Sequence, residues 1–449
     1  MENYDFTEGR IFGPLIRFTL PVMMALFLQS LYGAVDLLVV GQYAANEDIS
    51  AVSSGTMLMH TIMALTAGLS MGTTILLGQQ IGQKKPDQAG KTIGAAVVFF
   101  TIFAIVFSVL MFVNTPLLTR LMNAPEEAFS KTCSYIRICS GGLLFIVAYN
   151  VLGSLFRGIG NSRLPLLSVA IAAVVNIIGD LIMVKGLRMG AAGAAYATIG
   201  SQCISVLLSL LFLRRIDLPF LLQRGDIRFN KEITKKILNF GVPIALMDFL
   251  VSISFLVILS IVNSLGLLAS AGVGVAEKVC AFILLIPSAF GQSIASFTAQ
   301  NYGARKIDRA YRGLRYGIVT GLCFGTFLFW LSFFHGDLLC RIFSHDPQVI
   351  QLGWDYLKAY AIDCILTAIF FSMTGFFNGC GYTRFVMIQG VIGAFLVRIP
   401  VSWIMSKEVP ISLFHVGLAT PASSFVQCVL CIGYFFVVRN DLEQKMDIR

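Results

Sequence analysis

Residues 79–89 read QQIGQKKPDQA, and the same pattern returns at residues 300–310 as QNYGARKIDRA. Five residues of the first stretch recur 221 positions later, namely Gln79, Gly82, Lys85, Asp87 and Ala89. A second block recurs at the same offset and consists of Phe156, Gly158, Gly160 and Arg163. Two prolines, Pro21 and Pro125, have counterparts 222 positions later. Several matches in one order at nearly one offset indicate that the chain consists of two related halves.

The composition indicates a membrane protein. The chain has 449 residues, of which 57% are hydrophobic and 13% are charged, and its mean hydropathy is +0.80. Soluble proteins carry about 25% charged residues, so these values exclude a soluble enzyme, a disordered chain and an extracellular disulfide module. A membrane-spanning helix needs about 20 apolar residues. Twelve apolar runs fit: residues 15–40, 49–77, 92–113, 135–156, 164–184, 191–213, 240–265, 270–298, 313–334, 356–378, 385–406 and 413–438.

The basic residues of the loops predict the orientation of these spans. One set of loops, together with the two termini, holds 23 Lys and Arg residues, whereas the opposite set holds six. Membrane proteins concentrate Lys and Arg on the cytoplasmic side, so we expect both termini to be cytoplasmic. The same asymmetry accounts for the net charge of +9, and no nucleic-acid partner is expected.

The repeat predicts the architecture. Each half has six spans, an even number, so both halves start on the same side and are related by a pseudo-twofold axis along the membrane normal. We expect an all-α polytopic membrane protein of twelve transmembrane helices in two six-helix lobes around a central cleft. The predicted domains are residues 1–213 for the first lobe, 214–238 for a basic cytoplasmic linker, and 239–449 for the second lobe. This geometry suits an alternating-access transporter.

Two carboxylates in the first half mark a candidate site. Ionisable side chains at membrane depth are costly and by default functional. Asp36 and Asp180 each lie five residues before the outer end of an outward-running span, at about 7 Å depth, so we expect them at one level. Polar neighbours follow at helical spacing or comparable depth, namely Gln29, Tyr32, Asn150, Asn176 and Thr198. Such a cluster suits a proton or a hard cation such as Na⁺. The alternative is that the carboxylates line a hydrated vestibule and only adjust packing.

The second half is not equivalent. The counterparts of Asp36 and Asp180 are Ile258 and the neighbourhood of Val401, and Arg398 lies near the counterpart of Asn176. The second-lobe candidates are Asp248, Glu277, Asp363 and Arg398. We expect Arg398 to pair with one of these acids for structural reasons.

Other patterns point away from catalysis. The basic glycine-containing loops lack the GxxxxGK(S/T) spacing of a phosphate-binding loop, so we interpret them as turns between spans. The CxxC pair Cys428 and Cys431 lies in an apolar run with no second pair nearby, so a packing role is favoured over a metal site. We therefore expect a protein that is not an enzyme and has no cofactor or metal other than a coupling ion. Without ATPase motifs, transport must be ion-coupled or downhill.

Several ordered motifs resemble those of the multidrug and toxic-compound extrusion (MATE) family. They are LPVMMALFLQSLYGAVDLLVVGQ (20–42), LGQQIGQKKPDQA (77–89), LFRGIGNSRLP (155–165), VVNIIGDLIMVKG (174–186), GAAYATIGSQ (193–202) and AQNYGARKIDRA (299–310). The resemblance implies two six-helix lobes that form a V-shaped central cleft. It also implies efflux of drugs, toxins and other amphipathic or cationic organic compounds in exchange for inward H⁺ or Na⁺. The expected location is the bacterial inner membrane, where the protein would act as a monomer.

Within the family, the sequence is similar to the DinF-like branch, which places its cation site in the first lobe. The seven first-lobe residues that match this pattern are Gln29, Tyr32, Asp36, Asn150, Asn176, Asp180 and Thr198. The NorM-like branch has acidic residues where this chain has Val251 and Thr367, one turn from Asp248 and Asp363.

The mechanism expected from this resemblance has one further element and two alternatives. Pro21 breaks the helical hydrogen-bond ladder of the first span and is the expected bending point. A lipid-linked saccharide flippase of the same superfamily is the alternative transporter. A receptor or membrane enzyme is the other alternative, and the parallel repeat and the lack of a catalytic constellation argue against it.

Overall fold

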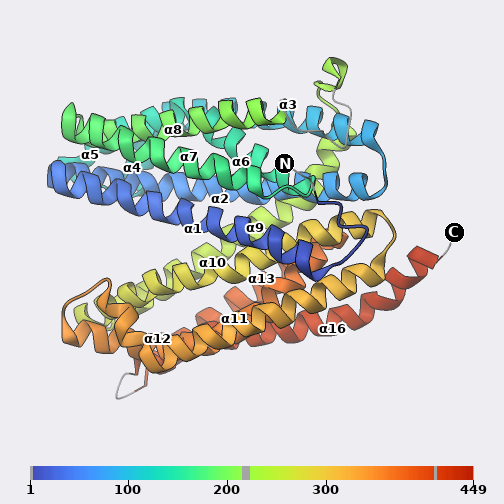
Figure 1. The fold of residues 1–449 in the computed structure, drawn as a ribbon. Coiled ribbons are helices and arrows are strands. Elements are labelled where there is room, and N and C mark those ends of the chain that lie inside the picture. Colours follow the sequence, from blue (N-terminus) through green and yellow to red (C-terminus); the bar gives the residue numbers. More distant parts are fainter. Residues whose placement is uncertain (1–3, 215–222, 409–411, 448–449) are drawn as a thin grey trace. The chain divides into compact units, whose positions relative to one another are not determined.

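The structure is a computed structural model that describes residues 4–214, 223–408 and 412–447. These residues form helices and no strands (Figure 1). The first half contains α1 (Phe12–Tyr43), α2 (Asn46–Gly82), α3 (Pro86–Val113), α4 (Thr115–Leu121), α5 (Glu126–Gly141), α6 (Leu143–Gly158), α7 (Arg163–Asp180), the π-helix η1 (Leu181–Gly186) and α8 (Gly190–Leu213).

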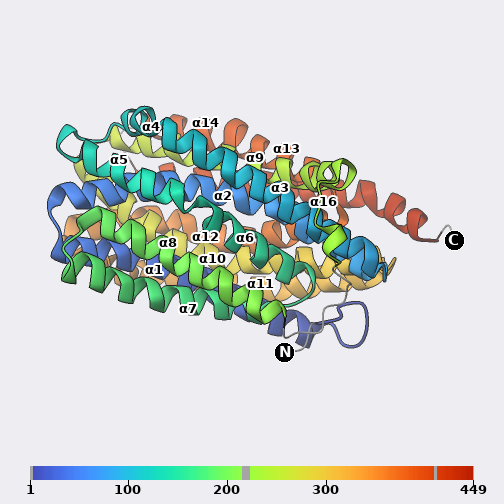
Figure 2. The same ribbon diagram turned by 90° about the horizontal axis from the view of Figure 1, so that it is seen from above.

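The second half repeats this order with small changes. It contains the short 3-10 helix η2 (Arg224–Asp226), α9 (Lys231–Asn263), α10 (Leu267–Gly303), α11 (Ile307–Arg341), α12 (Pro347–Cys380), α13 (Thr383–Val391), the π-helix η3 (Ile392–Arg398), α14 (Ile399–Met405), α15 (Leu413–Gly417) and α16 (Ala419–Asp447). The long helices of each half lie roughly along one another (Figure 2).

The predicted number of membrane spans is confirmed in the described part of the chain. Eleven helices are long and apolar enough to cross a membrane, and the bent pair α5–α6 makes up to twelve. The pair bends by 53° at Gly142, where an added Cβ would lie 2.5 Å from the Ile199 side chain on α8. Glycine therefore lets the bent span pack against its neighbour, and the fourth span consists of two helices.

The chain forms two compact units. The first unit contains the residues up to Asp5 together with Leu20–Ala245, and the second contains Phe6–Thr19 together with the residues from Leu246 onward. The chain thus changes unit within α1 and within α9, whereas the sequence analysis placed the division at residues 214–238. One continuous apolar cluster forms the core of the first unit, and two clusters form that of the second.

A clasp of side chains, formed by Lys306 and Arg309, explains why Phe6–Thr19 belongs to the second unit. Arg309 on α11 donates hydrogen bonds of 2.9–3.0 Å to the backbone carbonyls of Phe6, Glu8 and Gly9. Lys306 donates to the carbonyl of Thr7 at 2.9 Å. Phe6 is buried against Phe18 and Phe297. The repeated motif at residues 300–310 is therefore a turn between two spans, as predicted, and it also holds the N-terminal segment.

The start of α9 packs on the first unit in the corresponding way. The α2 and α9 backbones approach closely at Gly72 and Gly241, where an added Cβ would clash with backbone atoms of the facing helix. At Gly94 on α3, an added Cβ would clash with the carbonyl oxygen of Asp226. Each half therefore places the beginning of its first span on the unit built mainly from the other half.

Candidate functional site

The candidate site lies within the first unit, between α1, α7 and α8. Asp36 on α1 is 7% exposed, whereas Asp180 and Asn176 on α7 are fully buried. Helices α7 and α8 lie side by side (Figure 1). At Gly179, an added Cβ would lie 2.9 Å from the Ala197 Cβ. The glycine before Asp180 thus permits the close contact of α7 with α8, the helix that carries Thr198.

Hydrogen bonds connect four of the predicted site residues. The Thr198 hydroxyl donates a hydrogen bond of 3.3 Å to Asp36 Oδ2. The Asn176 amide nitrogen Nδ2 in turn donates to the Thr198 hydroxyl oxygen at 3.5 Å. The carboxyl groups of Asp36 and Asp180 face each other within hydrogen-bonding reach. The structure therefore places these two carboxyl groups next to each other within the first unit.

Most oxygens of the carboxyl pair lack donors. Within the described residues, four buried side-chain oxygens of the site have no hydrogen-bond partner, namely Asp36 Oδ1, both carboxyl oxygens of Asp180 and the side-chain oxygen of Asn176. A buried carboxylate without a donor or a counter-charge is costly. Four such oxygens on adjoining helices make a set that a shared proton, or a hard cation with oxygen ligands, would satisfy. Among the described residues, no group of three His, Cys, Asp or Glu side chains could hold a metal ion.

A local irregularity follows the site. The α-helix α7 ends at Asp180, and the next six residues form the π-helix η1. Short π-helical turns inside membrane helices leave the regular backbone ladder and often occur at functional positions. The irregularity begins immediately after the fully buried carboxylate, so the site and the change in backbone geometry coincide.

The other predicted site residues are less closely connected. Gln29 lies half-buried on α1, two turns before Asp36, and the Tyr32 side chain lies outside the described residues. Asn150 on α6 donates to the carbonyl of Ile146 in its own helix at 2.9 Å. The structure therefore brings together Asp36, Asp180, Asn176 and Thr198, and the described contacts do not join Asn150 to them.

The sequence analysis missed a tyrosine near the carboxyl pair. Tyr135 on α5 is buried, interacts electrostatically with Asp36, and has its hydroxyl 3.2 Å from that of Thr56. An added Cβ at Gly55 would clash with the Tyr135 ring, so the glycine makes room for it. The available signal was a tyrosine at the start of the fourth apolar run, but spacing within one run does not show which side chains of other helices it will face.

The second unit holds a buried pair of opposite charge. Arg398 is 6% exposed and Asp363 is 1% exposed, and the two groups interact electrostatically. Arg398 donates to the Ser254 hydroxyl at 3.2 Å and lies 4.4 Å from the Phe255 ring centroid. Asp363 is hydrogen-bonded to Ser424. Asp248 and Glu277 are half-buried on α9 and α10. The unit therefore carries a guanidinium near its fully buried carboxylate, which the first unit does not.

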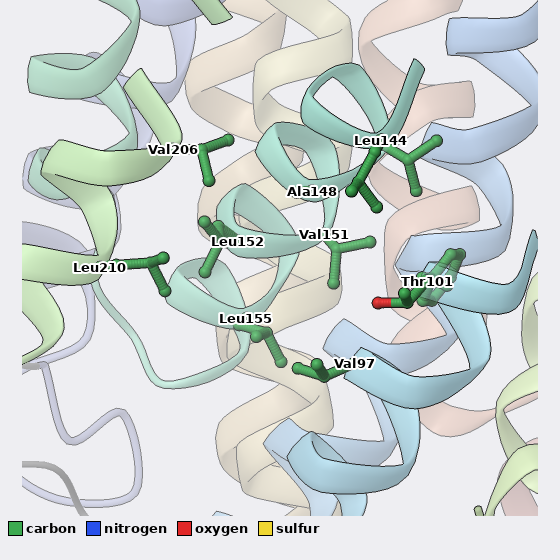
Figure 3. A pocket seen from close by; sticks show the side chains of 11 residues that line it. Val97, Thr101, Leu144, Ala148, Val151, Leu152, Leu155, Val206 and Leu210 are labelled. Atoms are coloured by element: carbon green, nitrogen blue, oxygen red, sulfur yellow. The ribbon is translucent and has the colours of Figure 1, made fainter. Parts of the chain in front are cut away.

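An apolar pocket in the first unit is separate from the acidic residues. It has a volume of about 170 Å³ and lies between α3, α6 and α8, where Figure 3 shows Val97, Val151 and Leu210 around it. The Thr101 hydroxyl is the one side-chain oxygen among its lining residues. Such an apolar lining does not suit ion binding.

Comparison with known proteins supports a common family. The family model described as MatE matches residues 21–182 and 243–404, one block in each half of the repeat. The chain is 28% identical over 432 residues to the probable multidrug resistance protein YpnP of Bacillus subtilis, covering 95% of this chain and 96% of the relative. It is 24% identical to the multidrug export protein MepA of Staphylococcus saprophyticus, covering 90% and 89%.

The fold has close counterparts among solved structures. A crystal structure described as MATE in complex with MaL6 superimposes with a TM-score of 0.92 at 21% identity, covering 99% of this chain and all of the other. The match extends over the whole helical architecture. The two sequence blocks, the helix order and this likeness together assign the chain to multi-pass membrane proteins built on that fold.

Proposed function

Because the chain belongs to the MatE family of multidrug and toxic-compound extrusion proteins, we propose that it is a secondary active efflux transporter. It exports amphipathic or cationic organic compounds in exchange for inward H⁺ or Na⁺. The names of its relatives support the substrate class. The single observation that supports ion coupling is the buried carboxyl pair Asp36–Asp180 with its donor-free oxygens.

The coupling follows from the electrostatics of that pair. Two neighbouring carboxylates repel each other in a low-dielectric interior when both are charged. A shared proton or a bound Na⁺ removes this repulsion, so the loaded and empty states of the site differ in free energy. That difference lets ion binding favour one conformation of the first unit over another. Asn176 and Thr198 supply an amide and a hydroxyl beside the pair.

The driving force is sufficient for useful efflux. One elementary charge that crosses 100 mV releases about 2.3 kcal/mol. That energy supports a substrate gradient of roughly fifty-fold, since each 1.4 kcal/mol corresponds to a factor of ten. One cation per cycle is therefore enough, and the transporter needs neither an enzymatic activity nor a cofactor besides its coupling ion.

The two units move by alternating access in this proposal. The chain passes from the second unit to the first between Thr19 and Leu20, one residue before Pro21. It passes back between Ala245 and Leu246, close to Pro243 in α9. Proline removes one helical hydrogen bond, so both crossings lie beside positions where a helix bends at low cost. We place both termini in the cytoplasm of a bacterial cell and treat the monomer as the transporting species.

The direct test is transport in reconstituted liposomes. The purified protein should move a cationic dye against the concentration gradient of the dye when a pH or Na⁺ gradient is imposed. Dye transport should stop when the pH or Na⁺ gradient is collapsed. Asp36→Asn should abolish concentrative transport while the protein stays folded, because Asn keeps the shape of the side chain without its charge. Concentrative dye transport by Asp36→Asn would remove the carboxyl pair from the mechanism. Movement of a lipid-linked saccharide in place of the dye would favour the flippase.

A further inference from the structure

The fifth spans of the two halves carry opposite charges at positions one helical turn apart in the repeat. Asn176 and Asp180 on α7 correspond, 222 positions later, to Arg398 and Ser402. The members of each pair are four residues apart, and Ser402 is fully buried like Asp180. Where the first unit has an amide and a carboxylate, the second unit therefore has a guanidinium and a hydroxyl.

The contacts of Arg398 support this equivalence. In the first unit, Asn176 and Asp180 lie against Asp36 on α1 through Thr198 and through direct carboxyl contact. In the second unit, Arg398 donates to Ser254 on α9, and α9 is the counterpart of α1 in the repeat. Ser254 lies one helical turn before Ile258, the residue that corresponds to Asp36. The guanidinium thus reaches the same region in its own unit as the carboxyl pair does in the first.

The fully buried carboxylate of the second unit lies on a different span from the two carboxylates of the first unit. Asp363 on α12 corresponds, 221 positions earlier, to Gly142, the residue at the α5–α6 bend. Gly142 packs against Ile199 on α8, and Asp363 bonds to Ser424 on α16. The compared regions therefore differ: the first unit buries the carboxylates Asp36 and Asp180, whereas the second buries Asp363 and Arg398. A third buried carboxylate of the first unit, Asp48, forms an ion pair with Lys131.

From this comparison we infer that the Arg398 guanidinium acts as a permanently bound cation. It occupies in the second unit the place that the exchangeable cation occupies in the first. The inference rests on the proposed function of Asp36 and Asp180. An arginine side chain stays charged in proteins and cannot leave the site. Because it balances Asp363, the second unit needs no ion from solution. This difference explains why one of the two similar halves couples transport to an ion and the other does not.

The titratable neighbours are consistent with this role. The groups that interact with Arg398 are Asp363, Tyr356 and Tyr360, all on α12. Asp363 in turn interacts with Cys280 on α10, Cys364 on α12 and Cys428 on α16. Glu277 on α10 interacts with Tyr356 and Cys280, whereas Asp363 is the carboxylate that interacts with Arg398 itself. Among the described residues, Asp363 Oδ1 and Arg398 Nε have no hydrogen-bond partner, so removal of either group leaves the other buried charge without compensation.

The test measures ion-dependent stability in a background that lacks the first-unit carboxylates. The full-length Asp36→Asn/Asp180→Asn protein, purified in detergent, should show the same Tm in Na⁺ and in choline, and in acidic and neutral buffer. Addition of Arg398→Asn, which installs the first-unit residue, should make Tm rise by about 2–4 °C in Na⁺ or in acid. Arg398→Lys should behave like Arg398, because it keeps the charge.

Two further variants decide the result. Arg398→Asn combined with Asp363→Asn should lose the new ion dependence, because the carboxylate that interacts with the guanidinium is then also gone. Asp363→Asn alone leaves the guanidinium without a counter-charge, so its Tm should rise by a similar amount in chloride compared with gluconate. This second variant carries the test if Arg398→Asn does not fold. A folded Arg398→Asn protein without ion dependence, or an Asp363→Asn protein indifferent to chloride, would overturn the inference.

Failure of the inference and failure of the proposed function give different results. The proposed function fails if the wild-type protein shows no ion-driven transport, whatever the variants of Arg398 do. The inference fails if the second unit gains no ion dependence in the background that already lacks Asp36 and Asp180 as carboxylates.

Discussion

Asp36 and Asp180 face each other with fewer donors than carboxylates usually have in a protein interior. Among the described residues, Thr198 and Asn176 are the side-chain donors that interact with Asp36. Hydrogen bonds that a buried carboxylate accepts stabilise its ionised form. In the proposed mechanism an ion supplies the missing stabilisation, and the Thr198 hydroxyl is a group through which the site can be adjusted.

Thr198→Val tests that dependence and identifies the ion. The change removes the donor and keeps the shape. If the coupling ion is H⁺, the ionised carboxylate loses a stabilising bond, so half-maximal efflux should move to higher pH by up to about one unit. If the ion is Na⁺, an oxygen ligand is lost and about five- to ten-fold more Na⁺ should be needed. Thr198→Ser is the matched control. Transport with unchanged pH and Na⁺ dependence in Thr198→Val would contradict the role of the hydroxyl.

At the residue scale, the structure brings together the acidic pair that the sequence singled out, but not all of the polar residues expected around it. Asp36, Asn176, Asp180 and Thr198 could be found because charged and polar side chains are conspicuous in apolar runs. Tyr135 was placed at the start of the fourth apolar run, but a single tyrosine there does not show which polar groups of other helices it will face. Asn150 was expected near the pair, but its amide bonds to Ile146 in its own helix. Hydrogen bonding within one helix competes with contacts across helices and is not visible in spacing alone.

At the scale of helices, close backbone contacts fix the packing of α2 on the start of α9. An added Cβ at Gly72 would clash with the backbone of residues 237–241. Gly72→Ala should therefore push the two helices apart and lower Tm by several degrees, since overpacking costs about 1–3 kcal/mol. Thermal unfolding in detergent measures the effect. Gly200→Ala on α8, where nothing lies within 4 Å of the added Cβ, should leave Tm unchanged or raise it. Equal Tm values for the two variants would refute this packing argument.

The clasp on the N-terminal segment gives a second prediction at this scale. Arg309→Ala removes the donor to three backbone carbonyls, each bond to a charged group contributing about 1.5–3 kcal/mol. The segment before α1 should then detach, and trypsin should cleave after Arg10 about tenfold faster or more. Arg315→Ala changes an exposed arginine on the same helix and should leave the cleavage rate unchanged. Equal rates in the two variants would show that the clasp does not hold the segment.

Helix boundaries show where sequence reasoning reached its limit. Each apolar run falls on a helix or on a helix pair of the structure, because hydropathy alone sets the length of a span. The break of the fourth span at Gly142 was not predicted, because a bend depends on which helix packs against it. The passage of α1 and α9 between units was missed for the same reason. It arises from contacts such as Phe6 with Phe297, which are almost 300 residues apart in sequence.

For the whole molecule, the charge of the loops predicts which end of each span faces the cytoplasm. In a cysteine-free background, a cysteine at Lys85, between α2 and α3, should react with an impermeant reagent only in inverted vesicles. A cysteine at Lys407, after α14, should react only in intact cells. Both positions are exposed, so accessibility reports the side of the membrane. Reaction of both from the same side would show that the count of membrane crossings between them is wrong.

The central claim concerns the whole transporter, because it assigns ion coupling to one of two related units. The most direct measurement is the movement of H⁺ or Na⁺ on addition of substrate to vesicles that contain the wild type, Asp180→Asn or Asp363→Asn. We predict that the wild type and Asp363→Asn move ions together with substrate, whereas Asp180→Asn does not. Ion movement retained in Asp180→Asn and lost in Asp363→Asn would contradict the assignment of coupling to the first unit.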